Sequence, residues 1–251
     1  METGQCKLCL QIKPLCKTSH IIPDFMYKGL YDVGHILYKV PTSDLSKEEK
    51  LPSGEYEPNL LCEDCENKIG KLESYACDIL YSDEEVKRGR LYRENQKNQN
   101  NVGYTFCKGV DYKKFKLFLL SILWKSSISS RDFFKDVKLG VYEEAIREMI
   151  LNEDPKDPKD YPCVISTYLN HKNKYPSDLI GQPLRIKDNL GTRYSFLIGG
   201  VHYFYFVSKL TQLSWISEAI LNEENKMRII HMTEEQAKML INKSIGDEIF
   251  K

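Results

Sequence analysis

The sequence predicts an α+β protein, in which a short, loop-rich N-terminal module precedes a larger α+β part with helices and a small antiparallel sheet. Six of the eight cysteines lie in the first 80 residues, among frequent glycines and prolines. After residue 111 the chain shows apolar stretches of helical period, then segments rich in Val, Ile, Tyr and Phe, which favour strands. We therefore expect a module at 1–82, a basic polar linker at 83–110 and a second domain at 111–251.

The composition limits the classes of function. Of 251 residues, 41% are apolar, which is enough to bury a core. The 36 basic and 36 acidic side chains cancel, so any surface that attracts nucleic acid or anionic lipid must be local. The chain does not start with basic residues followed by an apolar run, and its most apolar segment, 117–124, is too short to span a bilayer. We expect a cytoplasmic protein without membrane contact, with 117–124 in a buried helix.

The second half contains the clearest signals of regular structure. Residues 112–127 and 141–151 have the apolar period of helices. Residues 194–208 predict two strands that turn at Gly199 and Gly200. Thr233 and Gln236 have the spacing of a capping box, which predicts a last helix. The polar segment 83–110 has no apolar period, so we expect a linker or an exposed hairpin there.

Two CxxC pairs give the strongest local signal. They are Cys6 with Cys9, and Cys62 with Cys65. Each pair directs two thiolates to one point, and two pairs complete the tetrahedral shell of a structural zinc ion. A single CxxC can arise by chance or act as a redox pair, but two pairs around a loop-rich module favour Zn²⁺. Disulfides are not expected in a reducing compartment. The remaining cysteines are expected to be small buried hydrophobes: Cys16, Cys77, Cys107 and Cys163.

Further motifs lie between the two cysteine pairs. Residues 19–23 read SHIIP, and an Asn-Leu pair at 59–60 precedes the second CxxC. In this order, the motifs resemble the HNH (ββα-metal, zinc-ribbon or treble-clef type) endonuclease family, as an SHIIP…LCxxCE variant. The resemblance covers residues 6–75. It implies a zinc-stapled ββα-metal fold and hydrolysis of phosphodiester bonds. The same pattern is similar to that of uncharacterised bacterial proteins, some of them encoded near phage-defence genes.

The resemblance implies a role for three residues. His20 corresponds to the general base, and an imidazole suits this role at cellular pH. Asn59 would brace the loop that holds His20. Glu66 would bind the catalytic Mg²⁺ or Mn²⁺, which prefers oxygen ligands. The chain departs from the family at Ser19, where an acidic or histidine ligand is usual, and at Glu66, where His or Asn is usual.

Each of these residues also has a structural interpretation. His20 could be a core histidine, and Glu66 could be a solvated helix carboxylate. For Glu73, which shares a helix face with Glu66, the solvated carboxylate is the favoured interpretation.

A basic segment follows the module. Residues 87–116 contain nine Lys or Arg and two acidic residues, a local excess of seven positive charges. Such an excess is typical of a surface that faces phosphates, and a solvated linker is the alternative. The residues expected to contact nucleic acid are Lys87, Arg88, Arg90 and Arg93.

Two hypotheses follow. The first is a metal-dependent HNH-type endonuclease that acts on DNA, with RNA as the other candidate substrate, as an effector in phage defence. The second is a non-catalytic zinc-ribbon adaptor that binds nucleic acid or a protein partner. Residues 111–251 show no catalytic spacing, so we expect them to serve as a scaffold that binds a regulatory protein or a second copy of the chain.

Overall fold

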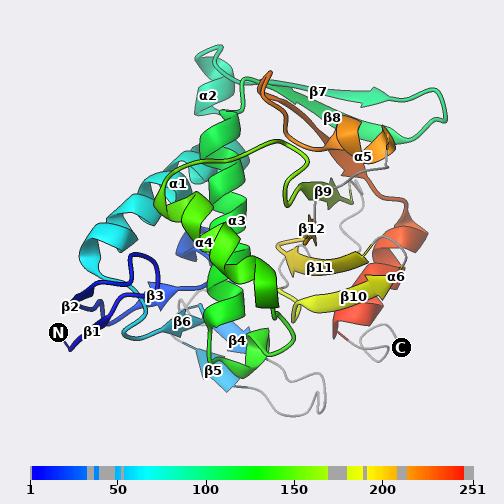
Figure 1. Cartoon of the computed structure of the whole chain (residues 1–251). Coiled ribbons are helices and arrows are strands. Elements are labelled where there is room, and N and C mark those ends of the chain that lie inside the picture. Colours follow the sequence, from blue (N-terminus) through cyan, green and yellow to red (C-terminus); the bar gives the residue numbers. More distant parts are fainter. Residues whose placement is uncertain are drawn as a thin grey trace.

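The computed structural model describes residues 2–32, 37–39, 49–51, 54–168, 180–188, 191–207 and 214–245. These described residues form helices and β-sheets in mixed order, which confirms the α+β class (Figure 1). None of their helices is both long enough and apolar enough to cross a membrane.

The N-terminal part consists of three short strand pairs and one long helix. The antiparallel pairs are β1 (Thr3–Gln5) with β2 (Ile12–Pro14), β3 (Ser19–His20) with β6 (Tyr56–Glu57), and β4 (Leu37–Lys39) with β5 (Glu49–Leu51). A 3-10 turn, η1 (Asp24–Tyr27), follows β3. Helix α1 (Glu63–Tyr81) begins at the second cysteine pair. Its buried residues recur every three or four positions, so one stripe of the helix faces the core.

A seven-stranded sheet forms the other side of the molecule. Its strands are β7 (Tyr92–Lys97), β8 (Gly103–Lys108), β9 (Cys163–Thr167), β10 (Leu184–Asp188), β11 (Gly191–Ile198), β12 (Val201–Phe206) and β13 (Lys226–His231). The order across the sheet is β10-β11-β12-β9-β13-β8-β7. All neighbours are antiparallel except β9 and β13. The sheet is therefore larger than the sequence predicted, and not purely antiparallel.

The remaining helices lie around this sheet. They are α2 (Glu84–Lys87), α3 (Tyr112–Ile128), α4 (Glu143–Leu151), α5 (Ser214–Ala219), α6 (Glu234–Ile245) and the 3-10 turns η2 (Asp132–Phe134) and η3 (Gly140–Tyr142). The capping box is confirmed, because Gln236 N–H donates to Thr233 Oγ1 and Thr233 N–H donates to Gln236 Oε1. The turn between β11 and β12 uses Gly199 and Gly200, both with positive φ, as predicted.

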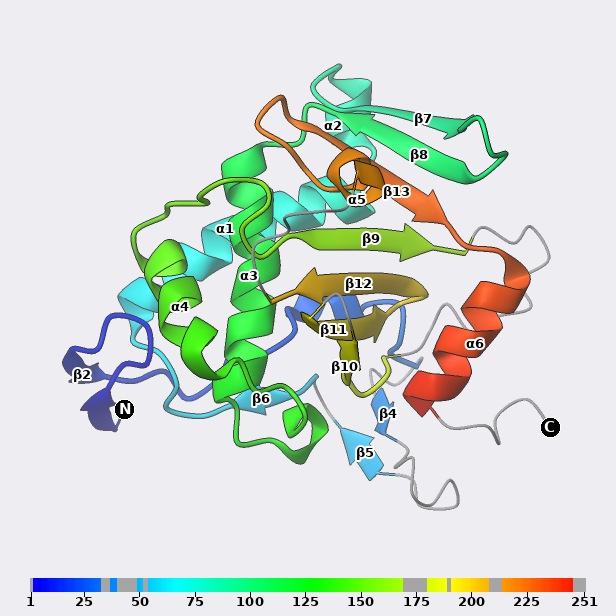
Figure 2. The same cartoon turned by 45° about the vertical axis from the view of Figure 1, so that its right-hand side comes forward.

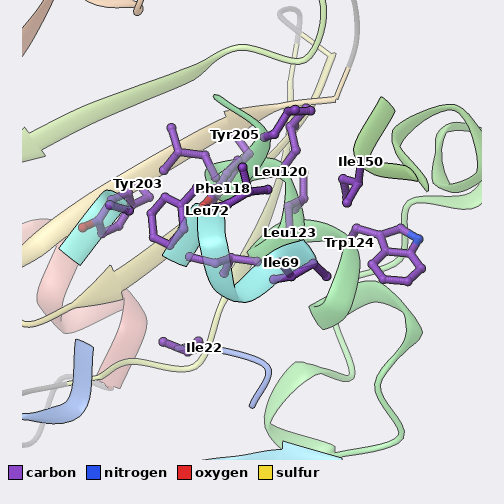
Figure 3. Packing of buried hydrophobic residues seen from close by; sticks show 14 of the residues in the cluster. Ile22, Ile69, Leu72, Phe118, Leu120, Leu123, Trp124, Ile150, Tyr203 and Tyr205 are labelled. Atoms are coloured by element: carbon purple, nitrogen blue, oxygen red, sulfur yellow. The ribbon is translucent and has the colours of Figure 1, made fainter. Parts of the chain in front are cut away.

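Helix α3 is the centre of the molecule. Nearly all its residues from Phe115 to Ser127 are buried, which confirms the buried helix predicted at 117–124. Helices α1 and α4 pack on α3. In Figure 2, α4 lies on the side of α3 away from the sheet and α1 crosses α3. Figure 3 shows the result at side-chain level, where Leu72 of α1, Phe118 of α3, Ile150 of α4 and Tyr205 of β12 belong to one cluster. The N-terminal part and the sheet therefore share a continuous core.

The segment 83–110 differs from a simple linker. Strands β7 and β8 form a hairpin that pairs with β13, so this segment takes the hairpin form and extends the sheet. Most side chains of β7 are exposed because the strand lies at the sheet edge. An exposed edge strand needs no apolar alternation, and for this reason the sequence pattern did not distinguish it from a linker.

Candidate metal centre and active site

Four cysteines meet at the start of helix α1. Cys6 and Cys9 come from the turn between β1 and β2, Cys62 is the N-cap of α1, and Cys65 lies in its first turn. Their sulfur atoms all lie within 4.8 Å of one another. The Sγ atoms of Cys9 and Cys62 are 3.9 Å apart, close to the roughly 3.8 Å edge of a tetrahedron with Zn–S bonds of about 2.3 Å. The cluster is placed to hold a metal ion such as zinc.

The surroundings of the cluster suit a closed structural site. The backbone N–H of Cys62 donates to Cys6 Sγ at 3.4 Å, as in metal-binding knuckles, where amides support thiolates. Burial raises the pKa of the Cys62 and Cys65 thiols. Four thiolates at this spacing therefore need a cation to offset their charge. The guanidinium group of Arg147 on α4 donates to the carbonyl of Leu8, which fixes the first knuckle to the rest of the molecule.

His20 lies in β3, opposite Tyr56 of β6. The centroids of the two rings are 6.3 Å apart in an edge-to-face arrangement. The Nε2 atom of His20 is buried and has no hydrogen-bond partner among the described residues. Burial lowers the pKa of His20, and the charge of Lys125 acts in the same direction, against Asp24 and Glu73. The lowered pKa favours the neutral imidazole, and one of its ring nitrogens is buried without a hydrogen-bond partner among the described residues.

Ser19 and Glu66 form a direct contact next to His20. The Ser19 hydroxyl donates to Glu66 Oε1. Burial raises the pKa of Glu66, while Ser19 and Lys125 act in the opposite direction. Ser19 stands where the family usually has an acidic or histidine metal ligand. Here its hydroxyl orients the carboxylate of Glu66, the residue predicted to bind the catalytic metal.

The sequence favoured a solvated carboxylate for Glu73, but the structure shows a partly buried one that is paired with a lysine. Its side chain is 24% exposed, and Oε1 accepts a hydrogen bond of 2.8 Å from the ammonium group of Lys125. The Lys125 side chain is 2% exposed and also donates to the backbone carbonyl of His20 at 2.6 Å. The sequence analysis missed Lys125 because the residue only bounded an apolar segment. The signal that could have identified it is its position within the predicted helix 112–127, where an apolar segment predicts burial and a lysine is unusual.

Asn59 occupies a turn before the second cysteine pair. Its φ of 57° is left-handed, a conformation that asparagine tolerates better than most residues. The backbone N–H donates to the Cys16 carbonyl at 2.9 Å, and the side-chain amide donates to Glu2 at 2.7 Å. Asn59 thus joins the second knuckle to the segment just before β3 by its backbone, whereas its side chain binds the N-terminus.

The expected Mg²⁺ site at Glu66 has fewer potential protein ligands than the cysteine cluster. Within the described part of the chain, the four cysteines are the one group of three or more His, Cys, Asp or Glu side chains spaced to hold a metal ion. Mg²⁺ often binds through one or two carboxylates and several waters. Glu66 could therefore serve as a ligand without a preformed set of three side chains.

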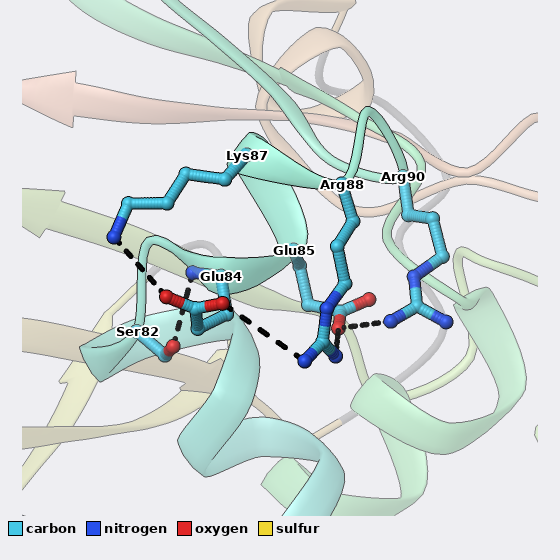
Figure 4. A network of polar contacts seen from close by, with 6 residues as sticks. All are labelled: Ser82, Glu84, Glu85, Lys87, Arg88 and Arg90. Carbon is cyan, nitrogen blue, oxygen red and sulfur yellow. Dashed lines mark hydrogen bonds and ion pairs between the residues drawn. The ribbon is translucent and has the colours of Figure 1, made fainter.

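The basic segment is paired with carboxylates that precede it. Lys87 and Arg88 form ion pairs with Glu84, and Arg88 and Arg90 form ion pairs with Glu85 (Figure 4). Arg93 lies 3.8 Å from Asp83. The local charge is thus smaller than a count from residue 87 suggests. The segment also lies at the opposite end of α3 from β3 and β6 in both views (Figures 1 and 2). With 17 residues, α3 is about 25 Å long.

A different basic residue lies next to Tyr56, the residue opposite His20 in the strand pair. Arg131 follows α3, and its guanidinium carbon is 5.5 Å from the centroid of the Tyr56 ring. The Nε–H group donates to the Tyr56 carbonyl at 2.8 Å. The side chain of Arg131 is 41% exposed, and its nearest carboxylate, Glu57, is 3.9 Å away. Arg131 and Tyr56 therefore place a cation and an aromatic face beside the histidine.

Comparisons with protein-family models, with curated proteins and with solved structures found no match to this chain.

Proposed function

We propose that the protein is a metal-dependent HNH-type endonuclease that hydrolyses phosphodiester bonds in DNA. The observation that carries the proposal is the position of His20. It lies on a short strand pair next to helix α1, and Glu66 and Glu73 lie on that helix. Its buried Nε2 has no hydrogen-bond partner within the described part of the chain. The four cysteines at the start of the same helix support it, because a structural zinc ion there would fix α1 relative to the strands.

The residues support a division of chemical roles. His20, neutral at physiological pH, would accept a proton from the attacking water. Glu66, oriented by Ser19, would hold the divalent cation. A bound Mg²⁺ or Mn²⁺ would supply positive charge opposite the phosphate and the leaving oxygen. Arg131 and Tyr56 would contact the phosphate and sugar or base next to the cleaved bond. A role in phage defence remains a prediction from the family resemblance.

The pH dependence of cleavage follows from the site. Because burial lowers the pKa of His20 below the ordinary 6.5, we expect the rate to reach half its maximum below pH 6.5 and to stay level through pH 8. Ionisation of Glu66, whose pKa burial raises, contributes to the same acid limb. The folded state favours neutral His20, so its contribution to stability is present above pH 6.5 and lost as the pH falls. A half-maximal rate above pH 7.5 in a plasmid-nicking assay would contradict this assignment.

DNA binding should depend more on Arg131 than on any single arginine near α2. Arg131→Ala removes a phosphate-facing cation, so the slope of log binding constant against log salt should fall by about 0.9. Arg88→Ala is the matched control, because Arg88 is exposed but paired with two carboxylates, those of Glu84 and Glu85, whereas Arg131 has, among the described residues, a single ion pair of 3.9 Å with Glu57. Fluorescence anisotropy with a short duplex measures both slopes in the His20→Ala background. A reduced slope for Arg88→Ala alone would place the phosphate contacts at the basic segment, as the sequence predicted.

The second candidate is the non-catalytic adaptor. It is favoured by the internal pairing of both carboxylates, since Glu66 binds Ser19 and Glu73 binds Lys125. In this case the protein binds DNA or a protein partner without hydrolysis. Mn²⁺ titration distinguishes the two, because an active site should bind Mn²⁺ in addition to the cysteine-bound metal and should lose that affinity in Glu66→Gln. The adaptor should show no second metal ion. A partner protein or second copy on residues 111–251 stays a prediction.

A further inference from the structure

Lys125 is a buried cation on the central helix. Its side chain is 2% exposed, and it projects from α3 toward the N-terminal part rather than toward the sheet, since its two hydrogen-bond acceptors lie in β3 and α1. Removing an ammonium group from water is costly unless several acceptors replace the lost hydration. The two acceptors of Lys125 are the His20 carbonyl and the Glu73 carboxylate.

These contacts join two elements of the candidate site that have no covalent connection nearby. The carbonyl of His20 belongs to β3, and Glu73 lies in the middle of α1. A single ammonium group at 2.6 Å from one and 2.8 Å from the other fixes the separation of strand and helix. It acts on the backbone of the very residue that carries the imidazole.

Stability alone is a weak reason for such a pair. A buried ion pair that is replaced by apolar residues of similar volume often leaves a protein as stable as before or more so. Phe118 and Ile122 precede Lys125 in α3 and are buried, so methionine is the apolar replacement of similar length. A charged pair here instead restricts geometry, because the ammonium group is bonded both to the His20 carbonyl and to the Glu73 carboxylate.

We propose that Lys125 is a positioning residue of the active site. It lies outside residues 1–82 and holds His20 and Glu73 at a fixed separation. The proposal rests on the proposed nuclease function. It implies that the N-terminal part does not contain the whole site, because α3 supplies its internal cation.

Three variants of the full chain test the proposal. Lys125→Met removes the cation, and the double variant Lys125→Met with Glu73→Gln also removes the carboxylate that is left unpaired. Lys116→Met is the matched control. Lys116 is buried on the same helix, but it donates to Tyr112 and to the Asp157 carbonyl, away from the site.

The expected result separates positioning from stability. Lys125→Met should lower both the melting temperature and the cleavage rate, and the double variant should regain the melting temperature while its rate stays about 10²-fold below wild type, the scale expected for a misplaced catalytic group. Lys116→Met should lose stability but keep its rate at permissive temperature. A double variant that cleaves within threefold of wild type would overturn the proposal.

A second readout does not depend on cleavage. The imidazole signals of His20 in a ¹H–¹³C spectrum, assigned by their loss in His20→Ala, should shift in the double variant and stay in place in Lys116→Met. If wild type cleaves no substrate, the nuclease function fails and these signals alone decide the positioning role. Unchanged His20 signals in the double variant would overturn it.

Discussion

Cys62→Ser is expected to release the bound metal and unfold the N-terminal part of the protein. A structural zinc ion contributes on the order of 10 kcal/mol to the folding of small domains, which is comparable to the whole free energy of unfolding of a typical domain, about 5–15 kcal/mol. The effect should extend beyond the knuckles. Cys62 is also the N-cap of α1, and the buried face of α1 belongs to the core shared with α3 and the sheet. We expect a large loss of helical circular dichroism and a fall in melting temperature of many degrees.

Metal analysis on freshly purified protein makes this prediction quantitative. Wild type should carry close to one zinc ion per chain, and Cys62→Ser should carry almost none. Cys77→Ser is the matched control, because Cys77 lies on the same helix but outside the cluster. It should keep the metal and most of the stability. Wild-type protein that contains no metal when purified without chelators would refute the structural zinc site.

His20→Ala is expected to lower cleavage by about 10²-fold or more, the usual scale for removal of a positioned base. Its zinc content and melting curve should stay close to those of wild type, because none of the described residues forms a hydrogen bond with His20 Nε2 that alanine would lose. The contacts that hold β3 in place use the backbone carbonyl of His20, which alanine retains.

A second histidine shows what the structural alternative looks like. His202 is 1% exposed, stacks on Phe204, and burial lowers its pKa to about 4. His202→Ala should therefore lower the melting temperature through a buried cavity and leave the rate of the folded fraction unchanged. If His20→Ala behaves like His202→Ala, with a lower melting temperature and an unchanged rate for the folded fraction, His20 is a core histidine.

Local patterns predicted most of the regular structure. The apolar period placed α3 and α4, the two glycines placed the β11–β12 turn, and the Thr233–Gln236 spacing placed α6. In each case the signal lies within a few residues of the element. The cysteine pairs also met as expected, because two CxxC turns restrict which sulfur atoms can share one ion.

The rest of the site depends on contacts between distant parts of the chain. No spacing within residues 1–82 indicates that Lys125 approaches Glu73, since the contact forms only when α3 packs on α1. The pairing of Arg88 and Arg90 with Glu84 and Glu85 was missed for a simpler reason. The charge count began at residue 87 and left out the helical turn just before it.

Cleavage of supercoiled plasmid by purified wild-type protein is the most direct test of the nuclease function. Wild type and His20→Ala, purified in the same way, are incubated with Mg²⁺ or Mn²⁺ at about 5 mM, a concentration above the dissociation constants of weak sites for hard cations. We predict nicked and linear products with wild type, strong suppression in His20→Ala, and no products after chelation of the divalent metal. Equal cleavage by both proteins, or none by folded wild type on DNA or RNA, would contradict the account.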